Sequence, residues 1–550
     1  MTTTIYPARR IVTMARATPD ATAVAVRDGR ILAVGSLEEC QSWGAAVVDD
    51  RYADSVLIPG FVEAHGHTFD AVVATLPYIG YYDWPLDDGT IARGCTSYAA
   101  VLDRLRTADR ELEPGQLLVA VGFDPIFFPN EPRLSRHLLD QVSSSRPIFI
   151  AHASGHLATV NTALLDAEGI TETTPTPGIH LGPDGTPSGE LQEAPAMSLA
   201  REAFGMRMKM ATDIGALRTH AGMARNAGVT TATELAGLAL LVPSLAERWR
   251  EVVEEDAFPL RMVLYNLAAM PGSSADYEAV AANVEALRAA NTAKFRCNGV
   301  KIIGDGSIQG WTAMVPWPGY FTGTDHGSLQ TSPEEMVQML AAFHRRQIQV
   351  HCHCNGAETV EAFVDAVEAA LVDYAWLDHR HVVQHAQTVS GAQLRRMGRL
   401  GVGANFFINH IWYWGDQHVE LTMGPERARA MWPCRSACEA GVAISFHTDS
   451  GVTPIGHLHT MWCAVNRLTP SGRVLGPAEA LTPAEALHAA TLGAAYQLRM
   501  DHEIGSIEAG KLADFAVLDR SPLEVAPMEL RELEVRGTMV GGIAHDAVRP

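Results

Sequence analysis

The sequence predicts an α/β protein whose centre is a (β/α)8 barrel of the TIM type. Short apolar runs typical of buried strands alternate with stretches rich in Ala, Glu and Leu that are typical of helices, such as 334–346 and 357–372. Strands that alternate with helices favour a parallel sheet, and eight such units close into a barrel. The eight strand-like runs are 56–62, 230–234, 261–265, 299–303, 347–353, 381–385, 401–407 and 442–449.

His65 and His67 follow the first of these runs and are one residue apart. Alternate residues of a strand share a face, so two imidazoles in this spacing can bind one metal ion. Imidazole is the commonest metal ligand, and zinc is its usual partner in hydrolases. The alternative for an isolated pair is two polar loop residues, and the rest of the chain decides between these interpretations.

Three later strand-like runs also end in metal-binding side chains. One run ends at His353, another at His385, and a third continues through His447 to Asp449. Lys301 lies inside a fourth apolar run. Active sites of barrel enzymes lie at the carboxyl ends of the strands, which is where these residues fall. The alternative for Lys301 is a lysine whose stem lies on the protein surface and whose ammonium reaches solvent.

This ordered set of side chains resembles that of the amidohydrolase superfamily and, within it, the branch called amidohydrolase family 3. The order in that family is His-x-His on the first barrel strand, Lys on the fourth, His on the fifth, His on the sixth and Asp on the eighth. Segments 409–416, 447–454 and 505–518 also resemble motifs of this branch. The positions that match the family order are His65, His67, Lys301, His353, His385 and Asp449.

The resemblance implies two divalent metal ions, most simply zinc, bridged by a hydroxide that attacks the substrate. Lys301 would bridge both ions as a carbamate formed with carbon dioxide, and Glu234 is the alternative bridging group. Asp449 would be the catalytic residue, first accepting the proton of the nucleophile and then passing it to the leaving nitrogen. The implied ligands are His65, His67 and Asp449 for the more buried ion, and His353 with His385 for the second.

The two ends of the chain are expected to form a small domain of their own. Residues 20–36 alternate small apolar residues with turns, which predicts a hairpin, and similar short strands recur near residue 515. In the family the two ends join as one β-sandwich beside the barrel. The resemblance therefore implies a small β-sandwich domain built from residues 1–55 and 500–550.

The barrel is expected to occupy residues 56–499 and to carry an insertion. The interval between the first and second strand-like runs is too long for one strand–helix unit, so we expect an inserted, lid-like subdomain at about 75–210 over the barrel mouth. Within it, His156 lies in a segment that resembles the Gly-His motif of the branch and is a candidate substrate contact. The alternative for His156 is a structural flap without a catalytic part.

Aromatic residues near the strand ends predict an aromatic-lined pocket for an apolar substrate. Trp311 stands where the branch often has an arginine, which disfavours an anionic substrate group at that position. The alternative is that several of these aromatic side chains belong to the core. The candidate substrate contacts are His156, Trp311, His410 and Trp414.

The resemblance thus implies a hydrolase that acts on a non-peptide carbon–nitrogen bond of the amide or N-substituted formamide type. The alternatives within the superfamily are a mononuclear deaminase and an ester or lactone hydrolase. A non-catalytic, ligand-binding barrel is a further alternative, which the complete set of six metal positions disfavours.

Composition restricts the partners and the compartment. The 550 residues carry a formal net charge of -21 at pH 7, which disfavours a nucleic-acid partner. The N-terminus is too polar for a secretory signal, and no apolar run reaches the roughly 18–20 residues of a membrane span. The eight cysteines are scattered, which favours reduced thiols and a cytoplasmic protein. We expect a small-molecule substrate, and a homodimer because family members are often dimers.

Overall fold

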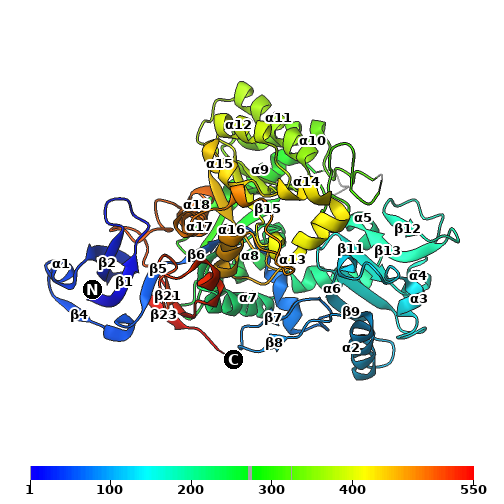
Figure 1. Ribbon diagram of the computed structural model, residues 1–550, viewed down its shortest axis with the longest axis horizontal. Helices are drawn as coiled ribbons and strands as arrows, with labels where there is room; N and C mark the ends of the chain where they lie inside the picture. The colour runs from blue at the N-terminus through cyan, green and yellow to red at the C-terminus, as the bar shows by residue number, and fades with distance from the viewer. Residues whose placement is uncertain (1, 270–274, 324, 550) are drawn as a thin grey trace.

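A parallel barrel forms the centre of the molecule (Figure 1). The computed structural model describes residues 2–269, 275–323 and 325–549. A bridge between Gly66 and Ser450 joins the segments that follow the first and last strands, so the sheet is nearly closed. The strands, in sheet order, are β6 (Phe61–Glu63), β14 (Val229–Glu234), β15 (Arg261–Leu267), β16 (Phe295–Ile303), β17 (Gln349–Cys354), β18 (Val382–His385), β19 (Gly403–Phe406) and β20 (Ile444–Phe446).

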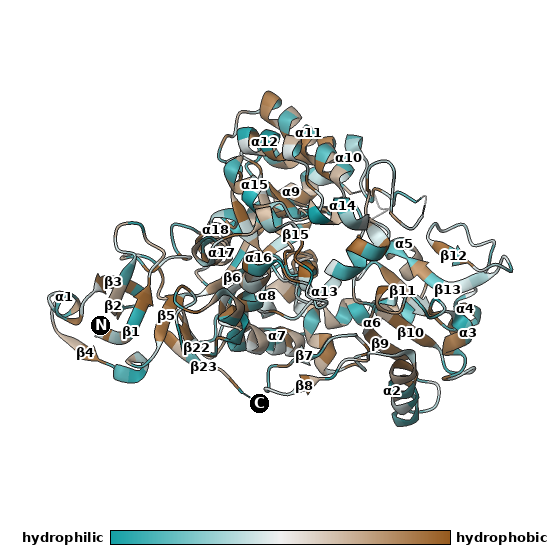
Figure 2. Ribbon diagram, in the orientation of Figure 1, coloured by the Kyte–Doolittle hydropathy of each residue, from teal (hydrophilic) through white to brown (hydrophobic). Residues whose placement is uncertain are grey.

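Helices between the strands cover the outside of the barrel (Figure 1). Their buried faces pack on the strands in one large apolar core, whereas outer helix surfaces carry many hydrophilic residues (Figure 2). The predicted helices at 334–346 and 357–372 are present with nearly these bounds. The helices are α7 (Ile214–Asn226), α8 (Pro243–Val253), α9 (Tyr277–Ala289), α10 (Pro333–Arg345), α11 (Ala357–Asp373), α12 (Gly391–Leu400), α13 (His410–Gln417), α14 (Gly424–Arg429), α15 (Cys434–Glu439), α16 (His457–Asn466), α17 (Pro483–Ala490) and α18 (Leu492–Gln497).

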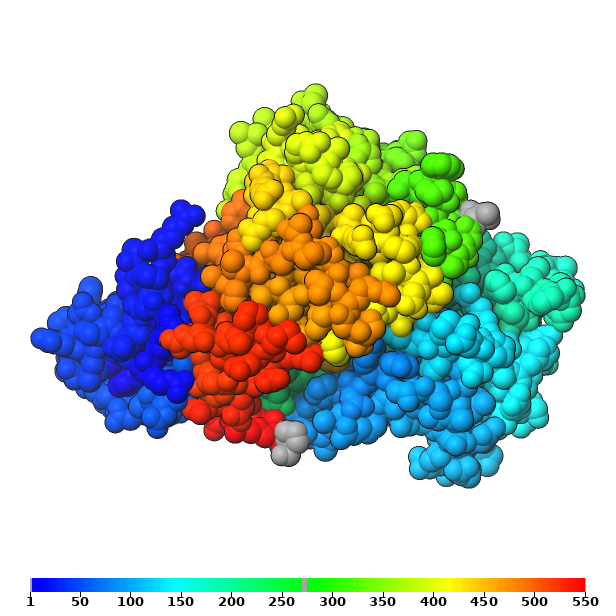
Figure 3. Space-filling model, in the orientation of Figure 1, coloured from blue at the N-terminus to red at the C-terminus, as the bar shows by residue number. Residues whose placement is uncertain are grey.

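The two ends of the chain meet in a single sheet beside the barrel, and their surfaces are neighbours in Figure 3. The N-terminal β5 pairs with both β1 and the C-terminal β21, so this sheet joins strands from both ends of the chain. All eight strands belong to one hydrogen-bonded sheet, and a two-layer sandwich stays a prediction. The strands are β1 (Thr3–Val12), β2 (Asp20–Arg27), β3 (Arg30–Gly35), β4 (Ala46–Val48), β5 (Val56–Pro59), β21 (Phe515–Leu518), β22 (Val535–Val540) and β23 (Ile543–Asp546), with α1 (Leu37–Gln41) beside them.

The predicted strand at 56–62 is in fact two strands that belong to different sheets. Its first half is β5 of the end sheet, and its second half is β6 of the barrel. The chain passes between the sheets at Gly60, where an added Cβ would lie 2.0 Å from Oγ1 of Thr230. Glycine permits this close approach of the backbone to the neighbouring strand.

A separate sheet lies between the first two barrel strands in sequence, at the right of Figure 1. Its strand order is β12-β13-β11-β10-β9, and it packs around its own apolar clusters. The limits of this insertion as a subdomain stay a prediction. Its elements are β7 (Trp84–Pro85), β8 (Ile91–Ala92), α2 (Tyr98–Glu111), β9 (Leu118–Phe123), α3 (Arg136–Leu139), β10 (Ile148–His152), β11 (Leu157–Val160), α4 (Thr162–Glu168), β12 (Ile179–Leu181), β13 (Pro187–Gln192), α5 (Glu193–Met197) and α6 (Arg201–Met210).

Within the residues that the structure describes, no helix combines the length and the apolar character needed to cross a membrane.

Candidate metal centre and active site

The six predicted metal positions lie together at the carboxyl end of the barrel. Two histidines follow β6, the aspartate follows β20, and the other three residues lie on β16, β17 and β18. Strand ends are rigid, so side chains placed there keep fixed positions relative to one another. All six side chains are buried or nearly so, and they are His65, His67, Lys301, His353, His385 and Asp449.

The first group of donors is formed by His65, His67 and Asp449. Nε2 of each histidine lies 3.4 Å from Oδ1 of Asp449. One ligand atom from each of the three residues falls within 4.8 Å of the other two. Nζ of Lys301 lies 3.2 Å from Nε2 of His65, so the lysine adjoins this group.

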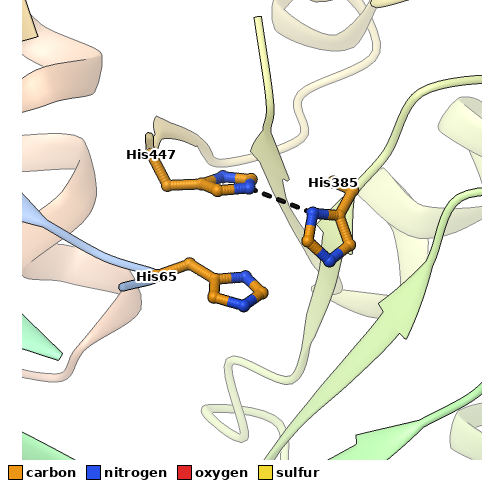
Figure 4. Close-up of side chains that lie close together, drawn as sticks. All are labelled: His65, His385 and His447. Carbon is orange, nitrogen blue, oxygen red and sulfur yellow. Dashed lines mark hydrogen bonds between the residues drawn. The ribbon is translucent and has the colours of Figure 1, made fainter. Parts of the chain in front are cut away.

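The second group of donors is formed by His353 and His385. Nδ1 of His353 lies 2.9 Å from Nε2 of His385, while Nε2 of His353 donates to the carbonyl oxygen of Gly306. Nδ1 of His385 lies 3.8 Å from Oδ2 of Asp449, so the aspartate lies between the two groups. The ring of His447, two residues before Asp449, contacts His385 at 3.1 Å, with His65 close by (Figure 4).

The hydrogen-bond partners of Nδ1 fix the orientation of the imidazoles of His65 and His67. Oε1 of Gln384 accepts from Asn405 and lies 2.8 Å from Nδ1 of His65, so that nitrogen carries the proton. Oε1 of Glu234 lies 3.0 Å from Nδ1 of His67. Nε2 of each ring therefore faces Asp449. An outer partner that holds one ring nitrogen while the other faces inward is the usual arrangement of a metal-binding histidine.

The donor atoms of this site fit a divalent metal ion. Oδ1 of Asp449 is buried and has no hydrogen-bond partner in the described part of the chain. It faces Nε2 of His65 and Nε2 of His67. Once His67 has lost its Nε2 proton, the lone pairs that converge here repel one another unless a cation lies among them. A neutral imidazole and a carboxylate are ligands that zinc prefers.

Burial and neighbouring charges set the protonation of these residues in the absence of metal. Burial lowers the pKa values of His65, His353 and His385 well below the ordinary value, so these rings are neutral. Burial also lowers the pKa of Lys301 to about 8. For His67 burial disfavours the charged ring, but the carboxylates of Asp449 and Glu234 outweigh it and raise the pKa to about 9.

An open cavity of about 980 Å³ leads to this centre. One part of its wall is formed by five of the predicted metal positions, all except His385. The opposite part comes from the inserted segment, including His156, Phe204 and Arg207. The insertion therefore forms part of the mouth through which a ligand reaches the strand ends.

Of the four predicted substrate contacts, His156 lines this cavity. Its Nδ1 lies 2.8 Å from Oε2 of Glu193, and its ring centre lies 5.2 Å from that of His353. The other three pack in an aromatic region outside the cavity lining. Trp414 is buried and donates from Nε1 to Asp124, His410 is buried against Trp414, and Trp311 packs beside them. Their contact with substrate stays a prediction.

Several polar residues that hold the centre are missed or assigned another role by sequence reasoning. Glu234, considered above as a bridging group, instead binds His67 and also accepts from the backbone and hydroxyl of Thr68. Glu63 is fully buried and accepts from Thr448, which precedes Asp449. Gln384 precedes a predicted ligand and Glu63 lies two residues before another. Position in the sequence alone does not reveal what these buried side chains contact.

The fold and the donor set together define a metal-dependent hydrolase. The sequence model of the family described as "Amidohydrolase family" matches residues 53–543, and the chain belongs to this family. The resemblance derived from the six positions is thereby confirmed at the level of the family.

Individual relatives are similar over almost the whole chain. The N-substituted formamide deformylase of Arthrobacter pascens is 27% identical over 518 residues, covering 91% of this chain and 90% of the relative. A putative amidohydrolase, YtcJ, of Bacillus subtilis is 24% identical and covers 91% of each chain. A solved structure of an uncharacterized metal-dependent hydrolase from Pyrococcus horikoshii has a TM-score of 0.71 at 20% identity, covering 96% of this chain and 99% of that one. This structural likeness shows the barrel fold.

Proposed function

We propose that this protein is a binuclear metal-dependent hydrolase that cleaves a non-peptide carbon–nitrogen bond of the amide or N-substituted formamide type. The observation that carries the proposal is the pair of imidazole groups on either side of Asp449. His65 with His67 forms one group and His353 with His385 forms the other. The two pairs adjoin each other with Asp449 near both, and this number of donors supports two ions rather than one.

The proposed ligands follow from which lone pairs face inward. His65, His67 and Asp449 hold the first ion, and His353 with His385 holds the second. Lys301, buried beside His65, is the proposed bridge after its amine adds carbon dioxide and loses a proton to give a carbamate. An ammonium at this position would repel both ions, whereas a carbamate supplies two oxygens that share one negative charge.

When bound, the ions supply a nucleophile at neutral pH and polarise the substrate carbonyl. Asp449 accepts the proton of that nucleophile and passes it to the leaving nitrogen. The position of its carboxylate between the two imidazole groups supports both proton transfers. Glu234 and Gln384 keep the two rings beside it in one orientation during the reaction.

The cavity supports an apolar substrate. Besides the ligands, its wall is mainly aliphatic and aromatic, including Phe69, Met197, Phe204, Leu238 and Leu267. The relative in Arthrobacter pascens is an N-substituted formamide deformylase. A formamide or small amide with an apolar substituent on nitrogen fits both observations.

Elemental analysis of metal per chain tests the binuclear site, on protein purified without chelator or added metal. We expect two ions in the wild type and one or none in Lys301→Ala. Lys209→Ala removes an exposed lysine from α6 and is the matched control, which should keep both ions. A single ion that Lys301→Ala leaves in place would contradict the proposal and favour the mononuclear deaminase.

Formate release from N-benzylformamide then tests the reaction. Hydrolysis that chelation abolishes and added metal restores supports the proposed function. Turnover of esters or lactones with no turnover of any amide would replace it with the alternative hydrolase activity. Zinc as the metal, a homodimer, a cytoplasmic location, and an end domain of sandwich type over 1–55 and 500–550 complete the proposal.

A further inference from the structure

Arg207 lies at the cavity that leads to the metal centre. It belongs to α6, which follows the inserted sheet, and its side chain is half-buried. Burial lowers the pKa of its guanidinium. No carboxylate in the described part of the chain forms an ion pair with it that would offset this cost. A half-buried cation without a partner is costly, so such an arginine usually has an anionic ligand.

A second, apolar chamber adjoins the metal cavity at this arginine. Both hollows share Arg207 and Met208 in their walls. Beyond that shared wall the chamber is aliphatic and aromatic, and it lies between the segment after His67 and the strands of the insertion. Its apolar lining includes Val72, Leu76, Tyr78, Trp84 and Val121.

The carboxylates that border these hollows are already engaged. Glu234 lines the chamber, but its oxygens accept from His67 and Thr68. Asp449 lies among the imidazoles of the metal centre. Neither is available to neutralise Arg207, so no carboxylate that borders these hollows in the described part of the chain supplies its counter-charge.

A second polar side chain of the chamber, His152, has a ring nitrogen without a hydrogen-bond partner in the described part of the chain. His152 lines the chamber and is buried, and its Nδ1 has no partner within the described residues. Its Nε2 lies 2.8 Å from the hydroxyl of Thr159. When that hydroxyl donates, Nδ1 carries the proton and can donate to an anionic ligand.

We propose that Arg207 binds a carboxylate on the nitrogen substituent of the substrate, whose apolar body occupies the second chamber while its carbon–nitrogen bond lies at the metal centre. The inference deepens the proposed hydrolase function and rests on it. It also places an anion-binding residue on the inserted segment rather than at position 311, where the sequence has a tryptophan.

A pair of substrates, with and without a carboxylate, tests on the metal-loaded protein whether the acid is preferred. N-(4-carboxybenzyl)formamide and N-benzylformamide differ only in the carboxylate. We expect wild type to favour the acid in kcat/KM by roughly ten- to hundredfold, the range of a charge-assisted hydrogen bond, and Arg207→Met to remove most of this preference. Lys209→Met deletes a charge from the same helix and should keep it. A preference that is absent in wild type, or that Arg207→Met leaves intact, overturns the inference.

Calorimetric binding of 4-methylbenzoate, with 4-methylbenzamide as the neutral counterpart, separates this inference from the proposed reaction. Selective binding of the acid to wild type, lost in Arg207→Met and kept in Lys209→Met, supports the role of Arg207 even if neither formamide is hydrolysed. Lack of turnover would then count against the proposed function alone. Binding of the acid that persists in Arg207→Met places it on the metal or elsewhere and overturns the inference, as does an absence of binding to wild type.

Discussion

Oε1 of Glu234, at the end of β14, lies 3.0 Å from Nδ1 of His67, which follows β6. The other carboxylate oxygen accepts from the backbone and the hydroxyl of Thr68, so both oxygens are fully used. The contact joins the first two barrel strands directly behind the metal centre. It also leaves Nε2 of His67 facing Asp449, the orientation that metal binding requires.

Glu234→Gln should weaken metal binding by roughly ten- to hundredfold, the usual effect of losing an outer partner of a metal-binding histidine. The amide presents one NH2 group to a contact where the carboxylate only accepted, and it removes the charge that makes the imidazole a stronger ligand. Zinc affinity measured by competition with a chelator checks this. Glu247→Gln, on the exposed side of α8, is the control. Equal affinity in Glu234→Gln and wild type would show that the carboxylate does not act through His67.

Metal affinity should rise with pH up to about 9. The carboxylates around His67 raise the pKa of its ring to about 9 in the metal-free protein, so at neutral pH the ion must displace a proton. Each unit of pH below that value costs up to about tenfold in affinity per displaced proton. Affinities at pH 6.5, 7.5 and 8.5, together with the number of protons released into buffers of different ionisation enthalpy, check the sign. An affinity independent of pH would contradict a protonated His67.

Trp414→Phe should lower stability more than it changes KM. The indole is buried and donates 2.9 Å to Oδ2 of Asp124 in the insertion, so its loss leaves that buried carboxyl oxygen without a donor. That costs about 1–3 kcal/mol, and we expect a lower Tm with a KM within about twofold of wild type. Trp43→Phe changes an exposed indole and serves as the control. A large rise in KM at unchanged Tm would instead support the substrate contact that the sequence predicts.

Asp514→Asn should destabilise the protein by about 3–5 kcal/mol, because it leaves a buried guanidinium without its counter-charge. Arg261 of β15 and Asp514 form two hydrogen bonds between the barrel and the end sheet, and both side chains are almost fully buried. The double variant Arg261→Met with Asp514→Asn should recover part of the loss, because no unpaired cation remains. Denaturant midpoints check the expected order of stability, in which the wild type is highest, the double variant intermediate and Asp514→Asn lowest. Equal stability of the single and double variants would rule out the uncompensated charge as the cause.

The gathering of the six predicted metal positions could be predicted because each one is signalled locally. His65, His353 and His385 end apolar runs, and a barrel brings all strand ends to one face, so the sequence distance between them does not matter. The break at Gly60 could not be predicted in the same way. Both halves of the run are buried strands, and only the close approach of Thr230 from another strand separates them.

Which of the four candidate side chains line the cavity could be predicted only in part, because helix orientation decides it. His410 and Trp414 lie on the first two turns of α13, and their sequence does not tell which side of that helix faces the cavity. Arg207 has an ordinary helical sequence around it, and its position at the cavity depends on how the insertion packs on the barrel. Long-range packing of this kind leaves no local pattern.

The pairing of β5 with β21 affects the order in which the protein can assemble. Pro59 pairs with Phe515, and Gly60 leads at once into β6 and then into His65 and His67. During synthesis β5 can pair with β1 at once, but its other edge has to wait for a partner that is made more than 450 residues later. Contacts of such sequence separation form slowly. The strand that leads into His65 and His67 therefore gains its second neighbour late in folding.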